Sequence, residues 1–224
     1  MRAVMQFLLR NRGFIAFVLC MVVFRSAVAD WNVVPTGSMQ PTIKIGDRIL
    51  VDRAAYDIRV PLTHISLWRL ADPQRGDIVV LDSAVAKERL VKRVIGLPGD
   101  LVALRANVLY INGKAATYTP ARASGIHADQ GSPARYAIER YGSMRHRIRL
   151  SLAHPSPASD FGPVRVPAQA YLLLGDNRDD SYDSRFLGFF PRSEILGRSR
   201  DVAYSLDPQD HYLPRRHRFA RALD

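Results

Sequence analysis

The sequence predicts a mostly β protein, in which an apolar N-terminal helix precedes a β-rich domain. Two observations lead to this prediction. One long apolar run lies near the N-terminus, and after residue 30 the apolar residues come in short runs separated by turn formers. No amphipathic helix of convincing length follows residue 30. The chain has 224 residues, of which 47% are apolar and 24% charged, and this balance excludes a disordered or collagen-like chain.

The apolar run covers residues 13–29, GFIAFVLCMVVFRSAVA, and holds a single charge, Arg25. A helix of this length reaches ~26 Å, just short of a ~30 Å hydrocarbon core. Arg2, Arg10 and Arg12 precede the run. The positive-inside rule therefore predicts a cytoplasmic segment at residues 1–12, a transmembrane anchor at residues 13–29, and export of the remaining chain.

A cleavable signal peptide explains the same run equally well. Its start is basic, and Ala27-Val28-Ala29 has the A-x-A form of a cleavage site. Both alternatives export the rest of the protein, so the predicted compartment is the same in either case.

Five short runs downstream are predicted to be strands. They are rich in β-branched or apolar residues, and turn formers such as Gly-Asp, Pro-Gly and Asn-Gly bound most of them. The runs are residues 48–51, 77–81, 89–95, 108–111 and 170–174. Residues 115–167 show weak periodicity and are predicted to form an inserted subdomain. The main β-domain then consists of residues 30–114 and 168–205, with a basic C-terminal tail at residues 206–224.

The charge of the chain suggests an anionic partner. The formal net charge is +11, from 32 Lys and Arg against 21 Asp and Glu. Residues 135–150 hold five arginines against one glutamate, and residues 215–221 hold four more arginines. We interpret both as solvated basic surface that could also face anionic phospholipids. Nucleic acid is not a predicted partner, because no binding motif is present. The single cysteine, Cys20, excludes an internal disulfide and a thiolate metal site.

Two residues are candidates for nucleophilic catalysis. Ser38 lies in the Gly- and Pro-rich stretch PTGSMQPT, although a loop serine is most often only a turn residue. Lys92 lies in a predicted strand, on the same face as Leu90 and Val94, whereas Arg93 shares the other face with an arginine.

Burial of the Lys92 face would disfavour the ammonium form and produce a neutral amine, which is a general base. Arginine could not act in this way, because it keeps its proton. Only Lys44, Lys87, Lys92 and Lys114 are lysines among the 32 basic residues, so a lysine here indicates that deprotonation is required. A strand-edge lysine with its amine in water is the ordinary alternative.

A third polar stretch follows the strand at residues 170–174. Residues 175–185 contain four aspartates that could offer oxygen ligands to calcium, but the EF-hand spacing is absent and two arginines intervene. The histidines show no metal-ligand spacing, and there is no G-x-S-x-G motif. The sequence predicts neither a metal nor a cofactor.

Taken in order, these stretches resemble the bacterial type I signal peptidases, a family of Ser-Lys proteases. The resemblance covers nearly the whole chain. It consists of the apolar run together with GSMQPT (37–42), RGDIVV (75–80), KRVIGLPGD (92–100), NGK (112–114) and GDNRDDSYDSR (175–185). Each block is modest, whereas their order and spacing together are highly specific.

The resemblance implies a role for each matching residue. Ser38 matches the nucleophile and Lys92 the neutral general base. The Ser38 backbone N–H and the Thr36 hydroxyl would form the oxyanion hole. Ser181 would orient the lysine, and Asp183 and Arg185 would form a structural ion pair. The pockets for small substrate residues at −1 and −3 would be lined by Val34, Met39, Ile43, Leu90 and Val91.

Two positions depart from the family pattern. Asp180 stands where the family usually has Asn, and its charge is expected to raise the pKa of the amine and to move the activity optimum to higher pH. Asn32 replaces a residue that is often apolar, so it is left out of the predicted pocket.

The function implied is a membrane-bound serine endopeptidase that removes signal peptides from exported preproteins. The implied location is the inner membrane, with a single uncleaved anchor and the catalytic domain on the outer side; the implied fold is a pair of antiparallel sheets. Two rival hypotheses remain. One is a specialised relative that matures a conjugative pilin, and the other is a non-enzymatic, membrane-tethered β-domain that binds lipid or cell wall.

Overall fold

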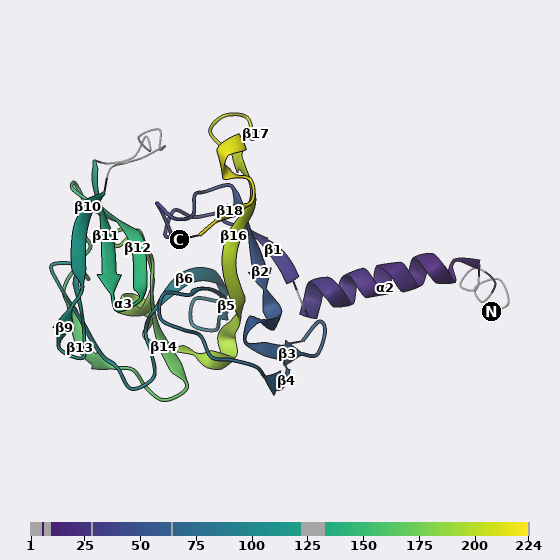
Figure 1. Ribbon diagram of the computed structural model, residues 1–224, viewed down its shortest axis with the longest axis horizontal. Coiled ribbons are helices and arrows are strands. Elements are labelled where there is room, and N and C mark those ends of the chain that lie inside the picture. Colours follow the sequence, from purple (N-terminus) through teal and green to yellow (C-terminus); the bar gives the residue numbers. More distant parts are fainter. Residues whose placement is uncertain (1–5, 7–9, 28, 64, 122–132, 224) are drawn as a thin grey trace.

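The computed structural model describes residues 6, 10–27, 29–63, 65–121 and 133–223. Arg2, Val28 of the A-x-A sequence and residues 122–132 of the predicted insertion lie outside the described residues. Helix α2 (Arg12–Ala27) projects away from the β-rich body, and it adjoins strand β1 and the 3-10 turn η1 (Arg53–Ala55) (Figure 1). Within the described ranges, no helix combines the length and the apolar character needed to cross a membrane.

The main sheet is antiparallel and its strands run in the order β1-β2-β16-β5-β6-β14-β15. Their bounds are β1 (Ala29–Val33), β2 (Asp47–Asp52), β16 (Ile195–Asp207), β5 (Ile78–Ser83), β6 (Glu88–Gly96), β14 (Ala170–Leu174) and β15 (Phe190–Pro191). Four of the five predicted strands correspond to β2, β5, β6 and β14. The central strand β16, with 13 residues, was not among the predicted strands.

Two smaller sheets flank the main one on the side away from α2 (Figure 1). One consists of β10 (Thr117–Ala121), β11 (Ala134–Tyr141) and β12 (Met144–Ser151). The other has the order β13-β7-β8-β9, with β13 (Phe161–Arg165), β7 (Leu101–Arg105), β8 (Val108–Ile111) and β9 (Lys114–Ala115). Strand β8 is the fifth predicted strand. Because β13 pairs with β7, the predicted boundaries of the insertion cut through this sheet. A shared core of Ile95, Val102, Met144 and Leu172 joins the sheets.

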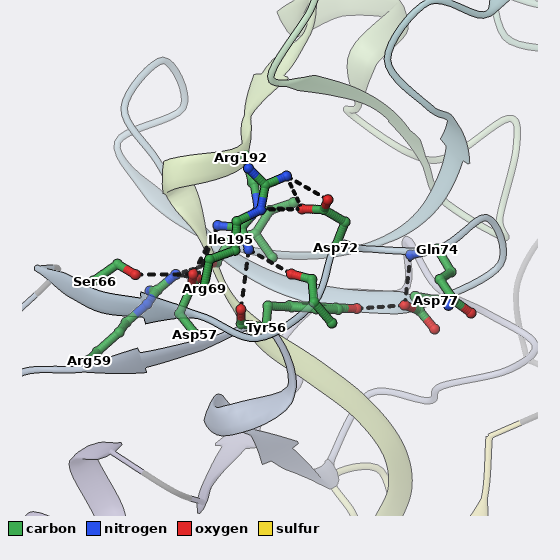
Figure 2. A network of polar contacts seen from close by, with 11 residues as sticks. Tyr56, Asp57, Arg59, Ser66, Arg69, Asp72, Gln74, Asp77, Arg192 and Ile195 are labelled. Carbon is green, nitrogen blue, oxygen red and sulfur yellow. Dashed lines mark hydrogen bonds and ion pairs between the residues drawn. The ribbon is translucent and has the colours of Figure 1, made fainter.

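A hairpin of β3 (Asp57–Arg59) and β4 (Ser66–Arg69) extends from the main sheet near η1. Figure 2 shows the polar network that fixes its base: Arg59 donates to the Ile195 carbonyl, and Arg192, at the start of η2 (Arg192–Glu194), binds Asp57 and Asp72. The rest of the hairpin is open to solvent, since every residue of β4 is exposed. The hairpin is therefore firmly anchored and presents apolar side chains outward.

The C-terminal segment is paired with the main sheet, so only part of it is the predicted solvated basic surface: Arg216 and Arg221 are exposed, whereas Arg215 and Arg218 are not. Strands β17 (Leu213–Pro214) and β18 (Arg221–Ala222) pair with β16. In the 3-10 turn η3 (Arg216–Arg218), Arg218 is buried and forms an ion pair with Asp47; Arg215 pairs with Asp207. In the other arginine-rich stretch, four side chains are exposed as expected, namely Arg135, Arg140, Arg145 and Arg147, and only Arg149 is buried.

Candidate active site

A cleft of about 840 Å³ opens on one face of the main sheet. Three stretches form its walls: residues 32–39, which run from the end of β1 into the next loop, residues 88–92 of β6, and residues 179–182 of the loop after β14. The lining is completed by Asp82, Ser156, Pro157 and Phe186. The three stretches are far apart in the sequence. The cleft therefore exists because the sheet brings β1, β6 and the β14 loop together.

Ser38 and Lys92 meet in this cleft. The Lys92 Nζ lies 2.7 Å from the Ser38 Oγ, within hydrogen-bond distance. Strand β6 places Lys92 opposite Val79 of β5, and the lysine side chain is only 3% exposed. Burial lowers the pKa of Lys92 to about 8, while the carboxylates of Asp183 and Glu88 act in the opposite direction. At pH 7, one unit below this pKa, about a tenth of the amine is therefore neutral.

Asp180 lines the same cleft as Lys92, but its carboxylate is not among those that raise the pKa of the amine most. Its Oδ2 lies 3.4 Å from the Asn177 Nδ2, which donates to it. The carboxylates that raise the pKa of Lys92 most are those of Asp183 and Glu88.

Arg93, the next residue of β6, lies on the opposite face and is also 3% exposed. Its guanidinium donates two hydrogen bonds to Asp176, of 2.8 Å from Nε and 2.7 Å from Nη2, and a third of 2.8 Å to the Gly76 carbonyl. Thr42 also donates to Asp176. Both faces of β6 are therefore buried at this point, and only one of the two cations has a carboxylate partner.

The two predicted oxyanion-hole donors both face the cleft. Ser38 is half-buried and Thr36 exposed, and both line the cavity. Within the described residues, neither the Ser38 N–H nor the Thr36 hydroxyl has a recorded hydrogen-bond acceptor. Two donors without acceptors beside a nucleophilic oxygen could bind the oxyanion of a tetrahedral intermediate.

Ser181 lies close to the Ser38 loop, but its hydroxyl has no partner. The side chain is 8% exposed, and its Oγ finds no hydrogen-bond partner in the part of the chain that the structure describes. Gly175 explains the close packing here. A Cβ on this residue would lie 2.2 Å from the Ser181 Oγ and 2.4 Å from the Ser38 carbonyl oxygen. Only glycine lets the loop lie directly against the Ser38 backbone.

Asp183 and Arg185 form a buried, two-point ion pair at the start of α3 (Ser184–Leu187). The Arg185 Nε and Nη2 each lie 2.9 Å from an Asp183 oxygen, and Nη2 also donates to the Arg178 carbonyl at 2.6 Å. Asp183 accepts from the Gly175 N–H at 3.0 Å as well. The pair thereby fixes both ends of the loop that carries Ser181.

The predicted pocket residues do not all reach the cleft. Val34, Met39, Leu90 and Val91 line it. Ile43 does not, because it is fully buried in the core cluster beneath, together with Val34 and Met39. Asn32 lines the cleft, although the sequence did not place it in the predicted pocket. Its Oδ1 accepts a hydrogen bond from the Arg89 Nη1 at 2.9 Å. The alternation of an extended strand could have found it, since residues 32 and 34 share a face.

The aspartates in and beside the loop after β14 are used in contacts with protein groups. The four aspartates once considered for calcium bind protein groups: Asp176 and Asp183 pair with arginines, Asp179 accepts from the Ser151 and Ser156 N–H groups, and Asp180 accepts from Asn177. Among the described residues, no group of three His, Cys, Asp or Glu side chains is placed to hold a metal ion.

Comparison with known proteins gives consistent results. The family model described as signal peptidase, peptidase S26, matches residues 8–204. A probable signal peptidase I-2 of Synechocystis sp. is 35% identical over 195 residues, covering 84% of this chain and 69% of the relative. Signal peptidase I of Pseudomonas fluorescens is 33% identical, covering 91% and 75%. Signal peptidase I of Bacillus amyloliquefaciens is 34% identical, covering 86% and 85%.

The matched region includes the Ser38 loop, the whole of β6 and the loop after β14, so all three walls of the cleft fall within it. The chain therefore belongs to the signal peptidase family, peptidase S26, and is a peptide-bond hydrolase.

Proposed function

We propose that this protein is a Ser-Lys endopeptidase that removes signal peptides from exported preproteins after small residues at −1 and −3. Ser38 is the nucleophile and Lys92 the general base. The observation that supports this assignment is the 2.7 Å contact between the Ser38 Oγ and a buried amine that no carboxylate pairs. Residues 30–114 and 168–205 would form the catalytic domain, with residues 115–167 as the insertion.

The reaction follows from these two groups. Lys92 takes the Ser38 proton as the Oγ attacks the scissile carbonyl, and the oxyanion is held by the Ser38 N–H and the Thr36 hydroxyl. Collapse of the intermediate breaks the C–N bond, and the Lys92 ammonium returns its proton to the leaving amine. Water, deprotonated by Lys92, then hydrolyses the acyl-enzyme. The Asp183–Arg185 pair would support the loop that carries Ser181, whose hydroxyl makes no hydrogen bond to the lysine among the described residues.

The open edges of two strands offer a place for the substrate. Strand β1 is the edge of the main sheet, and β14 pairs only with Arg93, Val94 and Gly96 of β6. Residues 88–92 therefore have one unpaired side, and a peptide can be added to either edge as a further strand. The side chains beside it, Val34, Met39, Leu90 and Val91, are apolar and mostly buried, and they favour small residues at −1 and −3.

We also propose that residues 13–29 anchor the protein in the inner membrane, with residues 1–12 in the cytoplasm and the catalytic domain outside. Large exposed apolar side chains lie on the strands beside the domain end of α2: Trp31, its strand partner Leu50, and Ile58, Leu67 and Trp68 of the hairpin. These would face the bilayer, where anionic phospholipids would contact the exposed arginines.

Retention of the anchor is favoured over its removal at Ala29. Ala29 and Asp30 pair with Asp52 and Val51 of β2, so the peptide bond between them lies inside a paired strand. A protease needs an extended and unpaired substrate, and the folded domain withholds this bond.

The test is incubation of the purified full-length protein, wild type and Ser38→Ala, with a preprotein in detergent. We expect the wild type to cleave once, after an A-x-A sequence, and the variant to be inactive but folded. Cleavage by Ser38→Ala at the wild-type rate would refute the proposal.

A further inference from the structure

Asn177 holds the backbone on both sides of Ser38. Its side-chain Nδ2 donates to the Gly37 carbonyl at 3.1 Å, and its backbone N–H donates to the Ser38 carbonyl at 3.0 Å. The Gly37 carbonyl also accepts from the Gln40 N–H at 3.0 Å. Asn177 is 1% exposed, so these bonds form away from water.

The first of these bonds determines where the Ser38 N–H points. A peptide group is planar and trans, so the Ser38 N–H is directed opposite to the Gly37 C=O. Because Asn177 binds this carbonyl from the loop after β14, the Ser38 N–H points in the opposite direction, away from Asn177. Among the described residues, this N–H has no hydrogen-bond acceptor, as expected of a donor that binds an oxyanion.

Arg149 holds the Asn177 side chain in turn. Its Nη1 donates to the Asn177 Oδ1 at 3.2 Å, which leaves the Nδ2 end of the amide to face Gly37. The main chain of Arg149 also binds the loop, donating to the Asp176 carbonyl at 2.9 Å and accepting from the Arg178 N–H at 3.0 Å. Arg149 belongs to β12, within the segment predicted as an insertion, and is 7% exposed.

We propose that Asn177 and Arg149 are positioning residues for the oxyanion hole, and that the three-stranded sheet β10–β12 serves catalysis through them. The inference rests on the proposed function. Neither side chain lines the cleft, so both act through the Ser38 backbone and not on the substrate. The amine of Lys92 is not part of this chain of contacts.

The experiment measures kcat, KM and the pH profile of the full-length protein in detergent with a peptide that spans a signal-peptide cleavage site. The variants are Asn177→Leu, which is neutral and similar in size, and Arg149→Met, which keeps every main-chain bond of β12. Arg147→Met is the matched control, because Arg147 lies two residues away on the same strand but is exposed. Active-site titration gives the concentration of competent enzyme, so that kcat is expressed per active site. Melting curves give the stability of each variant.

We expect kcat to fall about 10- to 100-fold in both test variants, as for a displacement of ~1 Å at a reacting centre. KM and the acid limb of the pH profile should stay at their wild-type values, and Arg147→Met should match the wild type throughout. A merely structural role would lower the melting temperature without lowering kcat per active site.

Several results would overturn the inference. One is a kcat of Arg149→Met equal to that of Arg147→Met, and this comparison decides the matter if Asn177→Leu does not fold. Another is a shifted acid limb, which would mean that these residues act on Lys92. Cleavage that does not depend on Ser38 would refute the proposed function itself, whereas Ser38-dependent cleavage with unchanged kcat in both variants refutes only this inference.

Discussion

Lys92 and Arg93 are neighbours on β6, point to opposite faces and are equally buried, yet their side chains have different partners. Arg93 meets both oxygens of Asp176, so its charge is compensated inside the protein. Among the described residues, Lys92 meets the hydroxyl of Ser38 and no carboxylate within hydrogen-bond distance. Burial alone therefore does not distinguish a structural cation from the proposed catalytic base; the presence or absence of a carboxylate partner does.

The physical reason is the cost of an uncompensated buried charge. A buried cation with a well-placed carboxylate keeps its proton, whereas one without such a partner gains by losing it. Lysine can respond in this way and arginine cannot. The two faces of β6 thus carry the two residue types that their surroundings require.

The largest expected effect is the loss of activity when Lys92, on the face of β6 that meets Ser38, is replaced. Lys92→Arg restores a permanent charge and removes the base, so we expect kcat/KM to fall by at least about 10³-fold, as when a member of a catalytic unit is lost. Lys92→Met, neutral and similar in length, should be equally inactive while it remains folded. Peptide cleavage and circular dichroism check both. Substantial activity of the arginine variant would exclude the neutral-amine mechanism.

On the opposite face the expected effect is on stability. Arg93→Met leaves the Asp176 carboxylate buried without its partner, which typically costs ~3–5 kcal/mol. The double variant Arg93→Met/Asp176→Asn should recover part of this loss, because no charge is then left unpaired. Urea unfolding of the wild type, the single variant and the double variant measures both quantities. A single variant as stable as the wild type would show that the pair contributes little.

The pH dependence of activity separates the two faces directly. The pKa of Lys92 lies at about 8, so the base is lost as the pH falls through that value. We expect kcat/KM to decline about tenfold per pH unit below it, as for titration of a single group in the free enzyme. A profile that is flat down to pH 5 would contradict a titrating base. Arg93 lies on the opposite face of β6, paired with Asp176, and has no part in this limb.

The smallest expected effect concerns a charge at the edge of the catalytic face. The Glu88 carboxylate raises the pKa of Lys92, so Glu88→Gln should lower that pKa and move the acid limb to lower pH. Asp210→Asn, an exposed acid in the C-terminal segment, is the control and should leave the limb in place. A shift to higher pH in Glu88→Gln would reverse the assigned electrostatics.

The sequence predicted the elements that are compact apolar or β-branched runs bounded by turn formers. Residues 77–81, 89–95 and 170–174 are such runs, and they correspond to β5, β6 and β14, although Asp77 itself lies just before β5. Ser38 and Lys92 were recognised because a lysine stood on an apolar face and because the surrounding motifs resembled a known family. Their 2.7 Å contact joins residues 54 positions apart, which no local pattern specifies.

Several of the missed strands have polar residues at buried positions. In the hairpin β11–β12, Glu139 and His146 point inward and are fully or almost fully buried, so the apolar alternation breaks there. Burial lowers the pKa of His146 to about 4, and Glu139 pairs with Arg178, so these polar residues are compatible with a core. Strand β16 was missed for a similar reason, because arginines and an aspartate interrupt its apolar residues.

The ion-pair partners of the buried charged residues could not be predicted from the sequence either. Nothing in the local pattern shows that Arg93 faces Asp176, which lies 83 positions away, or that Arg218 reaches Asp47 at 171 positions. Ile43 was assigned to the cleft by resemblance, and its burial in the core beneath depends on how the loop after Ser38 folds back.

The half-paired state of β6 has a consequence for turnover. A peptide that pairs with a strand edge is bound through its main chain. The signal-peptide residues before the cleaved bond would therefore be bound as tightly after cleavage as before it. The released leader would thus remain a competitor for the next preprotein, in proportion to its concentration in the bilayer. We therefore expect clearance of spent leaders by other proteases to govern the steady-state flux through this enzyme.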